Sequence, residues 1–436
     1  MSGESQKRIS ASLNEKLSGR SQLSNEKCIF RVHDRLRRHN PQAYEPEIVA
    51  IGPYHHGKSK LQNMEEHKLR YLQGLLHRRG ETSVERYIEA LLPLEGRARR
   101  CYAEEISLSK DDFVEMMCLD GCFLIETLRK SQQHNLRNDE DPIFQMDWLG
   151  LSVGRDLFLF ENQLPLFVLV QLFDMTKFAE SENLSDLAIP YFTTGFFPCR
   201  DGYQFCTKNS DGEAIHLLDL MHKSWCSSFA AKLPEIKDFC DDLPFEFIKS
   251  STELELRGIK FEKAERSTSW LHITFANGVI KIPPFPVGDV TETFFRNLVA
   301  YEEYILTGYE DRRCVTDYAI FMDCLIDSSR DVERLGQRGI ITNCLGDDAA
   351  VSTIINKLFN DVILRREHFC YRRLFKEVNE QSSRQLNIWK AHLMRNYFKT
   401  PWSIISFLAA CFLILLATVQ AIFSILQYTS GLTKQK

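Results

Sequence analysis

The sequence lacks the short motifs that identify the commonest enzymes. It contains no G-x-S-x-G elbow, no H-E-x-x-H helix, no protein-kinase signature and no repeat of roughly 20 to 50 residues. It also lacks a C-x-x-C pair, and its 13 cysteines are scattered between Cys28 and Cys411. This use of cysteine is typical of a reducing compartment and disfavours a secreted disulfide scaffold.

A strong excess of one charge is also absent. The formal net charge is −5 over 436 residues, with a pI near 6.2, so whole-chain electrostatics give no reason to expect a nucleic-acid partner. Residues 1–40 carry nine Lys/Arg and four Asp/Glu without the apolar core of a secretory signal. Residues 1–27 are therefore predicted to be a disordered, mildly basic tail.

The most distinctive feature present is an uncharged run from Trp402 to Tyr428. As a helix this run spans roughly 40 Å, more than the roughly 30 Å hydrocarbon core of a bilayer. Pro401 marks its entry, and its terminal aromatic residues suit the membrane interface. We expect a single-pass, tail-anchored protein in which a transmembrane helix is followed by a short tail, 429–436.

The charges that flank this helix indicate its orientation in the membrane. The basic residues beside the run are Lys390, Arg395 and Lys399 before it and Lys434 and Lys436 after it. With no signal peptide, they favour a cytosolic main domain at the plasma membrane or an endomembrane, although one glycosylation sequon begins at Asn183. Homo-association through the helix is a further possibility, carried by Ser406, Ala410, Ala417, Gln420 and Ala421.

Hydrophobic periodicity predicts a mainly α fold with one large domain, 28–390. Helical patterns occupy 61–76, 111–130, 155–175, 216–225, 291–304 and 316–335. Residues 253–284 alternate as strands around Asn277-Gly278, a two-residue hairpin signal, and 176–216 read as an irregular insertion. The prediction is a single helical domain with a small β insertion and one C-terminal transmembrane helix.

Two polar groups fall on apolar surfaces. In 61–76, Glu65 and Lys68 share the face of Met64, Leu72, Leu75 and Leu76, which predicts a partly buried ion pair that docks this helix. In 155–175, the cluster Glu161, Asn162 and Gln163 precedes Pro165. Because proline disfavours helix before it, we expect two elements that meet at a hydrogen-bonded corner. A catalytic carboxylate at Glu161 is the alternative.

Two further spacings suggest metal ligands but have simpler interpretations. Asp323, Asp327 and Asp331 recur every four residues, opposite the apolar face of 316–335, and are predicted to be a solvated stripe. Cys118 and Cys122 share a helical face without a nearby ligand set, so buried thiols are expected.

Residues 48–68, IVAIGPYHHGKSKLQNMEEHK, match the phosphate-binding loop pattern G-x-x-x-x-G-K-[S/T]. The matching residues are Gly52, Gly57, Lys58 and Ser59, after an apolar run that could form a strand. An anion cradle needs small residues whose N–H groups turn inward, whereas Tyr54, His55 and His56 fill this loop. Pro53 is no objection, because its position need not donate. No convincing strand ends in a magnesium-binding Asp. Nucleotide binding is therefore the second hypothesis, and an aromatic-rich turn that enters a helix is the first.

The adjacent histidines also suggest a metal site that they would form together with His67. Neighbouring side chains point in different directions, so His55 and His56 are not expected to bind one ion. No metal or cofactor is predicted.

The blocks YEPEIVAIGPYHHG, MEEHKLRYL, RDLFLFENQLPLFVL, GIITNCLGDDAAV and YFKTPWSIISFLAA, in this order, resemble the plant family called domain of unknown function 247. The resemblance covers residues 28 to 428. One departure is His33, where the family usually has proline. The resemblance implies a membrane-anchored, mostly helical plant protein without established catalytic residues.

Some grass members of this family are linked to self-incompatibility, which suggests protein recognition. The first hypothesis is thus a non-enzymatic membrane protein that binds or signals through a protein partner of unknown identity.

Overall fold

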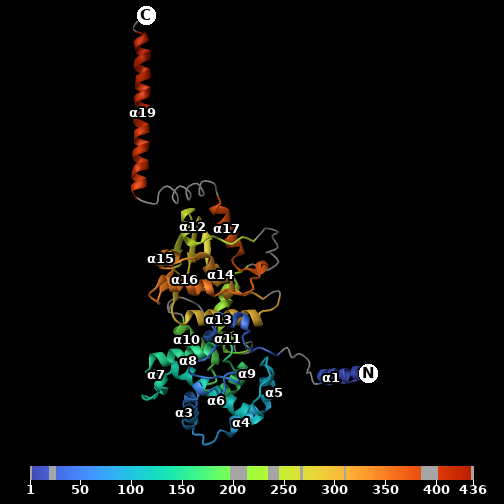
Figure 1. Cartoon of the computed structure of the whole chain (residues 1–436). Helices are drawn as coiled ribbons and strands as arrows, with labels where there is room; N and C mark the ends of the chain where they lie inside the picture. Colours follow the sequence, from blue (N-terminus) through green and yellow to red (C-terminus); the bar gives the residue numbers. More distant parts are fainter. Residues whose placement is uncertain are drawn as a thin grey trace.

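A computed structural model of the chain describes residues 2–18, 26–196, 214–233, 245–265, 269–308, 311–383 and 401–433. The described chain is mainly helical with a few short strands, as predicted. Figure 1 shows the N-terminal helices in one half of the main body, the C-terminal helices in the other half, and α13 (Thr291–Ile305) between them.

The N-terminal half is built around α6 (Lys110–Gln132), whose side chains are buried along most of its length. It packs against α3, α4, α9 and α10. Gly121 permits the approach of α9, since a Cβ at this residue would lie 2.4 Å from Leu172 Cδ1. The helices of this half are α2 (Asp34–Arg37), α3 (Asn63–Arg79), α4 (Glu85–Leu91), α5 (Glu95–Arg100), α6, α7 (Pro142–Gln145), α8 (Asp147–Phe158), α9 (Leu166–Thr176), α10 (Leu184–Phe196) and α11 (Leu217–Ala230).

The C-terminal half combines helices with two small sheets. The first sheet has the order β1-β3-β2, with β1 parallel and β2 antiparallel to β3; in the second sheet β4 pairs in parallel with β5. Its elements are α12 (Ser251–Leu256), β1 (Lys260–Lys263), β2 (Thr274–Ala276), β3 (Val279–Ile282), β4 (Phe285–Val287), α13, α14 (Cys314–Leu325), α15 (Ser329–Gln337), β5 (Ile341–Asn343), α16 (Asp348–Lys357) and α17 (Arg372–Ser382).

The predicted hairpin is confirmed between β2 and β3. Asn277 and Gly278 connect the strands with φ values of 52° and 79°. Positive φ at both central residues is the requirement of a type I′ turn, whose twist matches that of the flanking strands.

Three predicted segments differ from the structure. Residues 2–18, assigned to a disordered tail, form helix α1 (Ser2–Ser18), and its described side chains from residue 4 to 14 are exposed. The insertion predicted to be irregular contains α10, while residues 197–213 lie outside the described residues. Residues 251–256, at the start of the predicted strand region, are helical.

The prediction of one helix over 316–335, with a solvated aspartate stripe, is wrong in its second half. The helix ends at Leu325, and a new helix, α15, starts at Ser329. Asp331 is buried because it forms a capping box with Ser328 and accepts hydrogen bonds at 2.9 Å from Ser251 Oγ and Thr252 N. Asp327 is exposed and Asp323 half-buried, so the three carboxylates do not form one solvated surface.

The predicted transmembrane run lies within α19 (Pro401–Thr433), which also includes most of the predicted tail. Residues 405–425 are long and apolar enough to cross a bilayer, and their side chains are exposed. The association face from Ser406 to Ala421 lies in this helix and stays a prediction. The predicted boundary of the main domain at residue 390 lies outside the described residues.

Candidate functional site

The loop that matches the phosphate-binding pattern is part of a buried network. Its preceding run forms no strand, because side chains bind its backbone: the Asp156 carboxylate accepts the N–H groups of residues 47–49 at 2.6 to 3.0 Å. Asn162 Oδ1 accepts Ile51 N at 2.7 Å, and Asp120 Oδ2 accepts Gly52 N at 2.8 Å. These N–H groups are therefore not available to a phosphate.

Lys58 and Ser59 do not complete an anion cradle. Lys58 Nζ lies 2.6 Å from Glu45 Oε2 and 2.9 Å from His55 Nδ1, so its charge is paired within the protein. Ser59 begins a short 3-10 turn, Ser59–Leu61, and α3 starts only at Asn63. A phosphate-binding loop needs the lysine and the first helical turn directed at one anion. The geometry disfavours the nucleotide hypothesis.

The predicted ion pair on α3 is confirmed, with a partner that sequence reasoning missed. Lys68 Nζ is 2.6 Å from Glu65 Oε1, 2.6 Å from Asp120 Oδ1 and 2.7 Å from the Ala50 carbonyl. Lys68 and Asp120 are fully buried, whereas the Glu65 side chain is 33% exposed. The principal pair is thus Lys68–Asp120, and it ties α3, α6 and the loop before Gly52 together.

The predicted polar corner between α8 and α9 is also confirmed. Asn162 donates to the carbonyls of Val49 and Asp156 at 3.0 and 2.9 Å, and Gln163 donates to those of Leu157 and Leu159 at 2.9 Å. Leu166, the first residue after Pro165, starts α9. The amides therefore satisfy the backbone groups that this break leaves without helical partners.

Glu161 has no exposed surface. Its Oε1 accepts Val32 N at 2.6 Å and pairs with Arg37, while its Oε2 lies 3.6 Å from His55 Nε2. A substrate cannot reach a carboxylate enclosed in this way, so the arrangement supports a structural role over the catalytic alternative.

The histidines of the motif have different surroundings. His55 is buried, and this burial lowers its pKa. His56 and His67 are half-buried, and neither joins His55 in any of the metal-ligand groupings found among the described residues. His33 caps α2, since its Nδ1 accepts Arg35 N at 3.1 Å. Cys118 and Cys122 are buried thiols, as expected.

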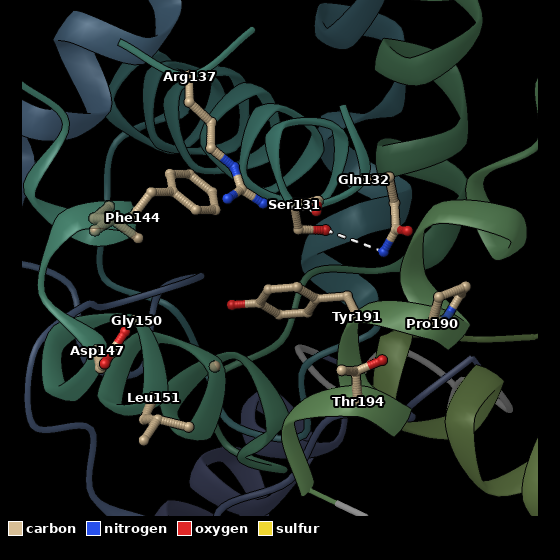
Figure 2. Close-up of a pocket in the computed structure, with 12 residues that line it drawn as sticks. Ser131, Gln132, Arg137, Phe144, Asp147, Gly150, Leu151, Pro190, Tyr191 and Thr194 are labelled. Carbon is tan, nitrogen blue, oxygen red and sulfur yellow. Dashed lines mark hydrogen bonds between the residues drawn. The ribbon is translucent and has the colours of Figure 1, made fainter. Parts of the chain in front are cut away.

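A pocket of about 630 Å³ lies elsewhere in the N-terminal half (Figure 2). Its walls come from the end of α6, the connection to α7, and helices α7, α8 and α10. The lining residues are Ser131, Gln132, Arg137, Ile143, Phe144, Asp147, Gly150, Leu151, Gly154, Pro190, Tyr191 and Thr194. A volume of this size is typical of a site for a small ligand or a few side chains.

Arg137 gives one wall of the pocket a positive charge. Its Nε and Nη2 donate at 2.8 Å to the carbonyls of Lys130 and Ser131, and its guanidinium lies 4.5 Å from the centre of the Phe144 ring. No described carboxylate forms an ion pair with it; Asp147 lies on another wall (Figure 2). The fixed guanidinium is suited to bind an anionic group.

Tyr191 extends into the cavity with its hydroxyl toward the space between Phe144 and Gly150 (Figure 2). A Cβ on Gly154 would lie 3.3 Å from this hydroxyl, so glycine provides the space that the tyrosine occupies. Burial raises the pKa of Tyr191, which keeps the phenol protonated and able to donate a hydrogen bond.

Exposed apolar side chains lie on α8 and on the residue that precedes it, next to the pocket-lining Asp147 in the sequence. Trp148 is 59% exposed and Leu151 56% exposed, and Met146 is also exposed. Leu151 lines the pocket itself. Sequence reasoning missed this region because its walls come from five segments that are separate in the sequence.

These elements define a mainly helical domain that carries a partly apolar pocket and is followed by a helix able to cross a membrane. The chain belongs to the family described as plant protein of unknown function, DUF247, which it matches over residues 29–416. The predicted family resemblance is thereby confirmed.

Two relatives come from Arabidopsis thaliana. The UPF0481 protein At3g47200 is 32% identical over 420 residues, which cover 92% of this chain and 87% of the relative. The putative UPF0481 protein At3g02645 is 23% identical over 485 aligned residues, 90% of this chain and 89% of the relative. No solved structure matches the chain.

Proposed function

We propose that this protein acts by binding rather than catalysis, as a membrane-anchored recognition protein. Its pocket receives a segment of a partner protein that carries an apolar side chain next to a carboxylate. The observation that carries the proposal is the Arg137 guanidinium, which pairs with no described carboxylate, in a pocket lined by the exposed Leu151 and by Asp147, the neighbour of the exposed Trp148.

The chemistry of the walls supports this occupant. Phe144, Leu151 and the ring of Tyr191 offer apolar surface, and large exposed apolar side chains that cluster beside a cavity are typical of interaction sites. Arginine and tryptophan are the residues that most often dominate the energy of a protein interface. The carboxylate of the partner would pair with Arg137, and its apolar side chain would enter the cavity.

The test uses the full chain in phosphatidylcholine nanodiscs and a phage-displayed library of random peptides. Selected peptides should combine an apolar residue with a neighbouring Asp or Glu. Leu151→Asp should lower the affinity for the best peptide at least about tenfold, the loss expected for an interface anchor. Arg137→Gln should remove the preference for a peptide over its Asp→Asn form. Affinities are measured by fluorescence anisotropy.

Leu69→Asp is a matched control, because Leu69 on α3 is exposed to the same fraction as Leu151, 56%, and does not line the pocket. It should leave the affinity unchanged. Failure to select any peptide, or equal losses in the two aspartate variants, would contradict the proposal.

Anchoring through α19 with the main domain in the cytosol belongs to the same proposal. It is supported by the exposed apolar surface of residues 405–425 and by the basic residues that precede them in the sequence. The chain is inserted into the membrane of microsomes whose cytosolic face is outward. Protease added outside should then digest the main domain. A main domain that resists protease until detergent is added would show that it lies in the lumen.

A further inference from the structure

A second buried group of potential ligands lies away from the pocket, between α11 and α13. His222 and Cys226 are one helical turn apart on α11, and Glu302 lies on α13. His222 Nε2 is 2.7 Å from Glu302 Oε1 and 3.6 Å from Cys226 Sγ, and the three ligand atoms all lie within 4.8 Å of one another. All three side chains are buried.

Glu302 is held in place by donors from the start of α14. Val315 N donates to Oε1 at 2.9 Å, and Thr316 N and Oγ1 donate to Oε2 at 2.7 and 2.6 Å. Outer contacts of this kind orient the carboxylate ligands of metal sites. Oε1 also remains in contact with the His222 imidazole.

Two buried carboxylates, those of Glu302 and Asp317, belong to the surroundings of this site. No described lysine or arginine forms an ion pair with Glu302 or with the buried Asp317 on α14. The buried Arg313 attracts Glu302 and Asp317 through space, but its hydrogen bonds go to the backbone carbonyls of residues 303 and 306. Because burying a carboxylate is costly, a cation bound directly to Glu302 would further stabilise its charge.

We propose that His222 Nε2, Cys226 Sγ and Glu302 Oε1 bind one divalent ion of the zinc type. Nitrogen, sulfur and oxygen ligands together suit zinc, whereas calcium and magnesium require oxygen. On binding, the Cys226 thiol releases its proton to solvent, and the thiolate and carboxylate then balance the two charges of the ion. Neutral His222 moves its proton from Nε2 to Nδ1, which ends its hydrogen bond to Glu302, and the freed Nε2 lone pair binds the metal.

The ion would join α11, α13 and, through Val315 and Thr316, the start of α14.

The first experiment measures metal content in the full chain, purified in nanodiscs without chelator and then loaded with Zn²⁺. We expect about one zinc per chain, the stoichiometry of one mononuclear site. Replacement of zinc by Co²⁺ should give a thiolate-to-cobalt charge-transfer band. Cys226→Ser should lose the bound metal and the band, while Cys344→Ser, which removes an exposed thiol, should retain both.

Thr316→Val tests the site without removal of a ligand. Loss of its hydroxyl contact to Glu302 should lower the affinity for zinc about 10- to 100-fold in a chelator competition, as is usual when a residue that orients a metal ligand is changed. Zinc should also raise the melting temperature of the wild type but not that of Cys226→Ser.

Wild-type protein that takes up no zinc and gives no cobalt band would overturn the metal site and leave a buried His–Glu hydrogen bond. Because this readout concerns the wild type, it does not depend on whether a variant folds. Metal content equal in the wild type and Cys226→Ser would overturn it as well.

Discussion

Replacing Lys68 with methionine should lower the free energy of unfolding by about 3 to 5 kcal/mol, the range for removal of one partner from a buried ion pair. Lys68 is the cation that compensates the fully buried Asp120. Burial already raises the pKa of Asp120 despite this lysine. Loss of the ammonium leaves the carboxylate uncompensated, and methionine fills the space without bonding to the Ala50 carbonyl.

The measurement is urea unfolding of the full chain in nanodiscs, followed by tryptophan fluorescence. Glu65→Gln is the matched control, since it removes the partly exposed carboxylate of the same network and should cost about 1 kcal/mol or less. Asp120→Asn in the Lys68→Met background should recover part of the loss. If Lys68→Met is no more destabilised than Glu65→Gln, the buried pair does not hold the loop.

Gly52→Ala should destabilise the protein by about 2 to 5 kcal/mol, far more than Gly57→Ala. Both glycines have nearly the same left-handed backbone, with φ of 72° and 75°, which costs an alanine about 1 to 2 kcal/mol. Only Gly52 has a close neighbour: its Cβ would lie 2.6 Å from the Gln163 carbonyl oxygen and 3.0 Å from the Tyr102 hydroxyl. Overpacking against this backbone adds roughly 1 to 3 kcal/mol.

Gly57 provides an internal reference, because nothing lies within 4 Å of a Cβ at that residue. The difference in urea midpoint between the two variants therefore reports the close approach of the corner after α8 to the loop. Equal midpoints would mean that the first glycine of the motif serves only the turn, not this packing.

Lys68 and its partner also illustrate how much of the site could be predicted from the sequence. The helical wheel placed Lys68 on a buried face because an i to i+3 relation is local. Asp120 is 52 residues away in the chain, in a helix whose apolar pattern gave no sign that one carboxylate would face α3. Such a pair depends on how two helices pack, which no local pattern contains.

The aspartate prediction failed for a different reason, since a local signal was present. Ser328 and Asp331 form the S-x-x-D spacing of a capping box, but the wheel treated 316–335 as one uninterrupted helix. Recognition of that box would have predicted a break after residue 325 and a bound carboxylate. Arg137 and Tyr191, by contrast, line one pocket only because segments distant in the sequence converge, so sequence alone could not define the pocket.

The N-terminal segment before Gly52 bonds to residues made much later. His33 N donates to Tyr304 Oη at 2.8 Å, His39 Nε2 lies 2.7 Å from Asp361 Oδ2, and Asn297 Nδ2 donates to the Ala43 carbonyl at 2.7 Å.

The last of these contacts joins positions 254 residues apart. At translation rates of roughly 5 to 20 residues per second, this segment leaves the ribosome about 10 to 50 s before its acceptors and donors exist. Completion of the fold must therefore wait until most of the chain has been synthesised. During that interval the polar and charged groups of the nascent N-terminal segment lack these native partners.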